Sequence, residues 1–182
     1  MKNSNTKFFL KIAIFILIIS ILILFALRIL SDYGIYVQIG TPPNGISHMT
    51  FSNLFKVAAI VSLVYLCNHE VLKGIVAWVG IFLVVIPSFQ LIEADYTSFS
   101  SPDDKEQFVV IERGYGRVYQ ISTSGLYMKY LTSTDTKRGY KPFSNGEYQL
   151  KWEEPNRLII HYAFRYTSTD LDKEISIQYK VN

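Results

Sequence analysis

Residues 8–30 read FFLKIAIFILIISILILFALRIL, and this stretch decides the kind of fold that the rest of the chain can adopt. Lys11, Ser20 and Arg28 are its only interruptions. An α-helix rises about 1.5 Å per residue, so roughly 20 apolar residues cross the ~30 Å hydrocarbon layer of a bilayer. A helix also satisfies its own backbone hydrogen bonds in lipid. The stretch therefore predicts a membrane-spanning helix.

The polar segment Met1–Lys7 precedes this helix and resembles the start of a signal peptide. A cleavable apolar region runs for about 7–15 residues and ends at a small-residue cleavage site. Here the apolar run continues to Leu30 and is followed by Ser-Asp-Tyr, so we expect a retained signal anchor. Because Lys2 and Lys7 precede the first span, the N-terminus is predicted to lie in the cytoplasm.

Two further apolar runs, Met49–Cys67 and Gly74–Ile92, predict a second and a third span. Lys56 lies in the first turns of the second span, where a lysine side chain can extend along the helix to the headgroups. Pro87 and Gln90 lie toward the end of the third span. Residues 1–96 thus form a predicted membrane domain, and three crossings place the C-terminal part outside the cytoplasm.

Residues 97–182 have a different composition and predict a soluble domain. They hold twelve of the chain's 18 Lys and Arg residues and eleven of its 15 Asp and Glu residues. Short runs rich in β-branched and aromatic residues alternate with turn residues, and apolar positions within them alternate with polar ones. The six predicted strands cover residues 108–112, 117–123, 125–132, 147–153, 157–164 and 174–181.

The predicted fold class is therefore an α+β membrane protein, in which three transmembrane helices precede a small antiparallel, sandwich-like all-β domain. Gly114–Gly116 and Pro155-Asn156 predict hairpin turns. A polar connector is predicted at Ser31–Thr50, and a polar linker is predicted at Glu93–Gln107. Trp152 is expected in the core of the β domain.

The segment Tyr36–Gly45, YVQIGTPPNG, resembles a stretch of pepsin-like aspartic proteases. The chemistry of that family needs two aspartates that share a proton. Neither Asp-Thr-Gly nor Asp-Ser-Gly occurs in the chain, and Ile46–Phe51 leads into a predicted span instead. The resemblance therefore does not predict a protease.

Several classes of function find no support in the sequence. The net charge of +3 is spread along the chain, so we expect no nucleic-acid partner. Cys67 is the only cysteine, so a zinc site with several cysteine ligands cannot form. The pair His69-Glu70 begins an H-E-x-x-H zinc motif, but Lys73 occupies the position of its second histidine. We therefore expect no metal or other cofactor. No G-x-S-x-G elbow accompanies His161, the single histidine of the β domain, and we expect a protein without catalytic residues.

Two function classes remain. The first is a non-enzymatic interaction module, such as an accessory subunit, sensor or immunity-type protein, whose partners are the lipid bilayer and a membrane or extracytoplasmic protein. Its candidate interaction residues are Tyr115 and Arg117. Nine of the 13 tyrosines lie in this domain, and they indicate either an aromatic binding surface or the strand propensity and core filling of a β domain. The second is a component of a small-solute or ion transport assembly, with Lys56, Pro87 and Gln90 along a path.

Overall fold

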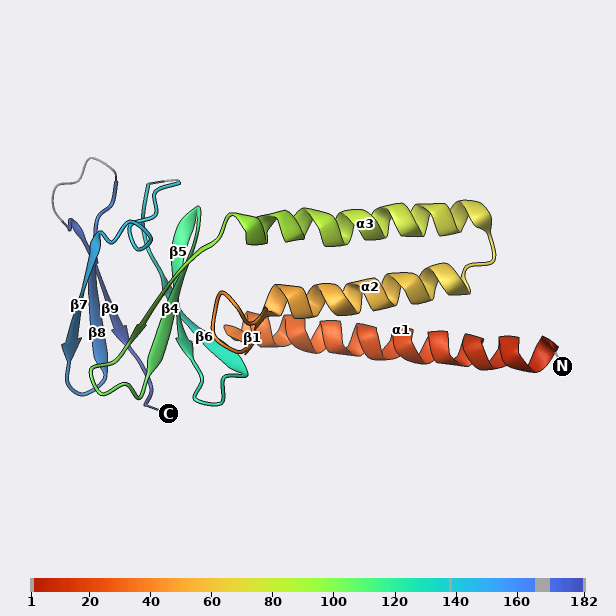
Figure 1. The fold of residues 1–182 in the computed structure, drawn as a ribbon, viewed down its shortest axis with the longest axis horizontal. Coiled ribbons are helices and arrows are strands. Elements are labelled where there is room, and N and C mark those ends of the chain that lie inside the picture. Colours follow the sequence, from red (N-terminus) through yellow and green to blue (C-terminus); the bar gives the residue numbers. More distant parts are fainter. Residues whose placement is uncertain (1, 138, 166–170, 182) are drawn as a thin grey trace. The chain divides into compact units, whose positions relative to one another are not determined.

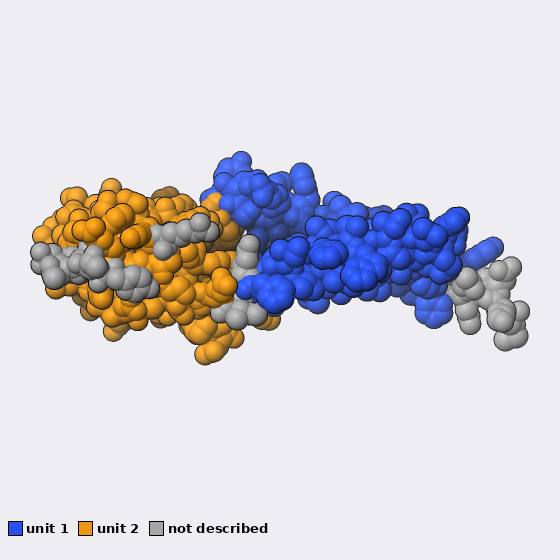
Figure 2. Space-filling view, turned by 90° about the horizontal axis from the view of Figure 1, so that it is seen from above, with its two compact units in different colours: residues 1–33, 48–92 blue, residues 34–47, 93–182 orange. Residues whose placement is uncertain are grey.

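The protein folds as two compact units in a computed structural model (Figures 1 and 2). A helical unit comprises residues 1–33 and 48–92, and a β unit comprises residues 34–47 and 93–182. The structure describes residues 2–137, 139–165 and 171–181, together with their side chains except those of residues 2–6 and 90–92. Each unit is considered by itself below.

The helical unit contains α1 (Lys2–Asp32), α2 (His48–Leu66) and α3 (Glu70–Ile92). The three predicted helices are thus confirmed, and their ends shift by a few residues. Each is long and apolar enough to cross a membrane. Helix α2 packs against both α1 and α3.

Close packing of α2 against α3 depends on a glycine. A Cβ atom on Gly80 would lie 2.6 Å from the Cγ2 atom of Ile60, which is closer than carbon atoms approach in folded proteins. The Ile60 side chain of α2 therefore packs directly on the α3 backbone at position 80, and a side chain there would displace it. Pro87 lies inside α3, as predicted, and its missing N–H leaves one carbonyl of the preceding turn without its helical partner.

The β unit consists of two antiparallel sheets (Figure 1). The larger is a curled half-barrel of six strands in the order β2-β1-β6-β5-β4-β3. Its strands are β1 (Ile35–Ile39), β2 (Ile46–Ser47), β3 (Asp95–Ser100), β4 (Gln107–Arg113), β5 (Tyr115–Ile121) and β6 (Tyr127–Ser133). The smaller sheet has the order β7-β8-β9, with β7 (Tyr148–Glu153), β8 (Arg157–Tyr162) and β9 (Lys173–Gln178).

The prediction of six strands was incomplete. The described part of the chain has nine, because the predicted polar connector contributes β1 and β2 and the predicted polar linker contributes β3. Strand β1 pairs with β6, so that Val37 lies opposite Tyr127. Such a pairing joins segments far apart in the sequence, and no local pattern in a turn-rich connector specifies it.

Both predicted hairpin turns are confirmed. Gly114 adopts a φ of 76° between β4 and β5, a backbone conformation that suits glycine, and Tyr115 and Gly116 already belong to β5. Asn156 adopts a φ of 95° between β7 and β8, where Glu153 pairs with Arg157. The turns therefore fix the register of the strands on either side of them.

The core of the β unit contains side chains from both sheets. Its buried members are Phe108, Val110, Val118, Phe143, Leu158, Ile160, Tyr162 and Ile177. Trp152 packs against this cluster from β7 and is itself partly buried, with its ring 5.5 Å from that of Phe108. The core position predicted for Trp152 is thus at the margin of the cluster.

Candidate functional site

The face of the six-stranded sheet that does not contribute to this core is rich in tyrosine. We call the set formed by Tyr36, Tyr96, Tyr119 and Tyr130 the tyrosine face. The rings of Tyr36 and Tyr130 contact Tyr119 edge-on, with centroid distances of 5.5 and 5.8 Å. Tyr119 is buried, whereas the other three tyrosines are half-buried. Edge-to-face contacts of this kind favour fixed ring positions, and the tyrosines pack around the buried side chains of Val109, Ile121 and Met128.

Arg117 and Tyr115 lie beside the tyrosine face on β5, two residues apart and therefore on the same side of the strand. An Nη atom of Arg117 donates a hydrogen bond of 2.5 Å to the Tyr115 hydroxyl. The guanidinium carbon also lies 5.1 Å from the centroid of the Tyr115 ring. The hydrogen bond to Tyr115 raises the pKa of Arg117 above its ordinary value, so the guanidinium is a permanent cation.

Tyr119 has a raised pKa for a different reason. Its burial disfavours the phenolate, although its hydrogen bond to Arg117 acts in the opposite direction. The ring therefore stays neutral at physiological pH and donates or accepts hydrogen bonds as a phenol.

Arg117 is exposed and, among the residues that the structure describes, has no carboxylate within 4.0 Å. Arg157, another exposed arginine of the β unit, differs in this respect. It donates a hydrogen bond of 2.7 Å to Ser176 and lies 3.6 Å from a carboxylate oxygen of Glu153. Arg117 thus has donors left for an external acceptor and, unlike Arg157, is not engaged by a carboxylate among the described residues.

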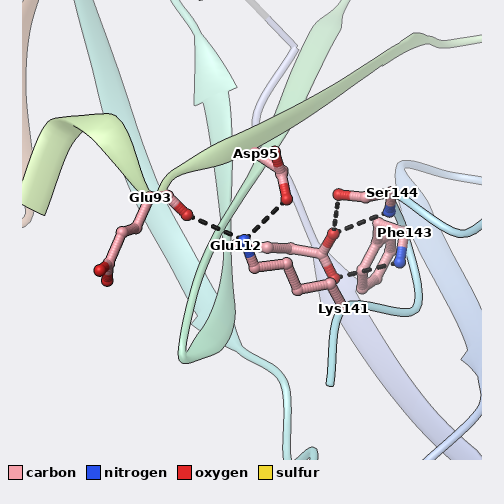
Figure 3. Close-up of polar contacts among 6 residues, drawn as sticks. All are labelled: Glu93, Asp95, Glu112, Lys141, Phe143 and Ser144. Atoms are coloured by element: carbon pink, nitrogen blue, oxygen red, sulfur yellow. Dashed lines mark hydrogen bonds and ion pairs between the residues drawn. The ribbon is translucent and has the colours of Figure 1, made fainter. Parts of the chain in front are cut away.

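A buried carboxylate elsewhere in the β unit has a structural role (Figure 3). Glu112 accepts hydrogen bonds from the backbone N–H groups of Phe143 and Ser144, at 3.1 and 2.7 Å, and one of 2.5 Å from the Ser144 hydroxyl. These bonds join β4 to the loop before β7. The carboxylate thus makes three hydrogen bonds to this loop and acts as a clamp between the loop and β4.

Lys141 joins the same loop to the start of β3 (Figure 3). Its ammonium donates hydrogen bonds to the backbone carbonyl of Glu93, at 2.9 Å, and to Asp95, at 2.7 Å. Both partners come from the predicted linker, so Lys141 holds the start of β3, while pairing with β4 forms the strand itself.

Two of the predicted path residues lie near each other in the helical unit. Lys56 donates a hydrogen bond of 3.2 Å to the side-chain oxygen of Asn53, and the Asn53 amide donates one of 3.0 Å to Ser88. Ser88 follows Pro87 directly, so this chain of bonds connects Lys56 to the Pro87 turn. Gln90 is part of α3, but its side chain is outside the described residues.

His161 is a cross-strand neighbour of Glu174, with its Nδ1 atom 3.7 Å from the carboxylate. Among the described residues, no group of three His, Cys, Asp or Glu side chains is arranged to hold a metal ion. The geometry around His161 is therefore that of an ordinary pair on the surface of a sheet.

Sequence reasoning missed Asn53, Ser88 and Glu112. A usable signal existed for Glu112, because it continues the alternation of Phe108 and Val110 and so points to the same buried face. Asn53 and Ser88 are polar residues within apolar runs, but nothing in the sequence indicates that they face each other. Comparisons of the chain with protein-family models, with curated proteins and with solved structures found no match.

Proposed function

We propose that this protein is a membrane-anchored, non-enzymatic interaction module whose β unit binds an acidic segment of a protein partner through Arg117 and Tyr115. The observation that carries the proposal is the exposed guanidinium of Arg117, which has no carboxylate partner among the described residues and lies against an aromatic ring. Arginine and tyrosine are enriched among the residues that dominate binding energy in protein interfaces. A guanidinium also binds a carboxylate through two parallel hydrogen bonds.

The proposal includes the topology that the charges near the first span favour. In the proposed topology the N-terminus lies in the cytoplasm, which Lys2 and Lys7 favour, and three membrane crossings leave the β unit outside. In this arrangement the β unit, anchored in the cell membrane, can bind only partners at the outer surface. The lipid bilayer and an extracytoplasmic or membrane protein are the proposed partners.

The transport alternative has weaker support. It needs a polar path near Lys56 and Pro87, whereas the groove between α2 and α3, about 350 Å³ in volume, has an apolar lining. The residues that line it are Val57, Ile60, Val61, Val64, Ala77, Gly80, Ile81, Val84 and Val85. Such a groove favours contact with lipid chains over passage of a solute.

Site-specific photo-crosslinking in native membranes tests the proposal. A photoreactive phenylalanine analogue at position 115 should form an adduct of one discrete mass, and the Arg117→Ala substitution should remove most of it. Arg157→Ala is the matched control, because Arg157 is exposed but already engaged by Glu153 and Ser176. The same analogue at the exposed position 151, on the other sheet, controls for random collision.

Adducts of equal yield with Arg117→Ala and with Arg157→Ala would contradict a role for the guanidinium. Protease digestion of intact cells tests the topology separately. The β unit should be cut while a cytosolic protein stays intact, and protection of the β unit until lysis would contradict its external location.

A further inference from the structure

The polar residues between α2 and α3 form a directed chain of hydrogen bonds. Ser88 donates to the backbone carbonyl of Val84 at 2.7 Å and accepts from the Asn53 amide, and the Asn53 oxygen accepts from Lys56. These bonds fix which end of the Asn53 amide faces Lys56, since only its oxygen can accept from an ammonium. Lys56 is therefore held in place on a support that spans two helices.

The Lys56 ammonium has donors left over. It carries three N–H groups, and in the described part of the chain its hydrogen bond is the one to Asn53, with no carboxylate within 4.0 Å. A cation in an apolar span without a counter-ion is costly, and such residues bind an anion or reach the membrane surface. Lys73, which lies at the other end of the helix pair, differs because it makes an ion pair of 2.7 Å with Glu70.

Asn53 and Ser88 lie near the ends of their helices. Asn53 lies five residues after the start of α2 at His48, which corresponds to roughly 7 Å along the helix axis. Ser88 lies four residues before the end of α3 at Ile92, roughly 6 Å along its axis. If these helices span a bilayer, the ammonium is near the boundary between headgroups and acyl chains.

We propose that Lys56, supported by Asn53 and Ser88, binds the phosphodiester of an anionic phospholipid. The ammonium supplies a charge and two free donors, and the apolar groove between α2 and α3 continues from the site along the helices and can accept an acyl chain. A lipid without a cationic headgroup is preferred, because the trimethylammonium of phosphatidylcholine competes with Lys56 for the phosphate. The inference requires α2 and α3 to span a membrane and does not depend on the binding role of the β unit.

Lipid retention by the full chain tests this proposal. The protein is reconstituted into mixed phosphatidylcholine and phosphatidylglycerol bilayers, extracted in an uncharged detergent and examined by native mass spectrometry. Lys56→Gln should weaken retention of phosphatidylglycerol about tenfold, equivalent to roughly 1.4 kcal/mol. Asn53→Ala, which keeps the charge but removes its support, should produce a smaller loss. The matched control is Lys73→Gln, which also removes one positive charge and should retain lipid as the wild type does.

Circular dichroism checks that each variant keeps its helix content. If Lys56→Gln does not fold, lipid retention by Asn53→Ala still tests the proposal. Equal retention by the wild type, Lys56→Gln and Asn53→Ala would overturn the proposal. If Lys73→Gln lost as much lipid as Lys56→Gln, net charge alone would explain the retention, and the proposal would be overturned as well. Displacement of phosphatidylglycerol by equimolar inorganic phosphate would overturn the lipid assignment in favour of free phosphate. With a photoreactive residue at position 56, an adduct to a protein instead of a lipid would overturn it in favour of a partner helix.

Discussion

The two faces of the six-stranded sheet use aromatic residues in different ways. On the face toward the smaller sheet, Phe108 is fully buried and its ring contacts Phe99, Trp152 and Tyr179. On the opposite face Tyr130 is half-buried and contacts Tyr119. The first face stabilises the fold by removing apolar surface from water. The second face also buries Val109, Ile121 and Met128, but its tyrosines other than Tyr119 stay half-buried and the neighbouring Arg117 side chain is exposed.

The largest expected effect tests this difference directly. Phe108→Ala should lower the free energy of unfolding of the β unit by about 3–5 kcal/mol, because it opens a cavity in the packed core. Tyr130→Ala, on the tyrosine face, should cost about 1 kcal/mol, since less area is lost there. Denaturant unfolding of the full chain in detergent measures both, with Trp152 fluorescence as the probe in a Trp78→Phe background. Equal costs would show that the two faces are equally important for stability.

A smaller effect is expected at the clamp that joins β4 to the loop before β7. Glu112→Gln replaces an acceptor-only carboxylate with an amide that has a single acceptor oxygen, so one or more of its three hydrogen bonds is lost. We expect a cost of about 1–3 kcal/mol in the same unfolding assay. The control is Glu153→Gln, which alters an ion pair at the surface and should leave the free energy of unfolding nearly unchanged. A cost no greater than that of the control would contradict the clamp.

High pH should destabilise the β unit through its buried phenols. Burial raises the pKa of Tyr119 and of Tyr162 above the ordinary value of 10.0. The unfolded chain therefore loses these protons first, so the stabilising contribution is fully present below about pH 10 and decreases as the pH rises through the folded pKa values. Unfolding measured from pH 8 upward should show this decrease, and Tyr119→Phe should make it shallower. If Tyr119→Phe left the dependence of the unfolding free energy on pH unchanged, the Tyr119 phenol would not contribute to that dependence.

The smallest expected effect concerns the outer surface of the smaller sheet. His161 pairs with Glu174 across the strands and is partly exposed, so His161→Gln should change the free energy of unfolding by less than about 1 kcal/mol. Crosslinking from position 115 should also be unchanged, because His161 is not part of the proposed binding surface. A loss of binding with this variant would move the functional surface to the smaller sheet.

Much of the architecture could be predicted from local patterns. Apolar runs long enough to cross a bilayer gave three helices, and alternation of apolar and polar residues gave the strands β4 to β9. The turn residues Gly114 and Asn156 were recognisable because their backbone conformations restrict the residue types allowed. For the candidate site, Tyr115 and Arg117 were named as interaction residues, but their contact with the tyrosine face was not.

Features that depend on residues close together in the chain could be predicted before the structure was known. Helix length, strand alternation and turn chemistry all act within a few residues. By contrast, the pairing of β1 with β6, the hydrogen bonds of Glu112 to the loop around Phe143 and the contact of Asn53 with Ser88 depend on how distant segments pack. The physical reason is the same in each case: partners 31 to 35 residues apart or more are brought together by packing of the whole unit, and short polar side chains carry no local signal of the partner that they will meet.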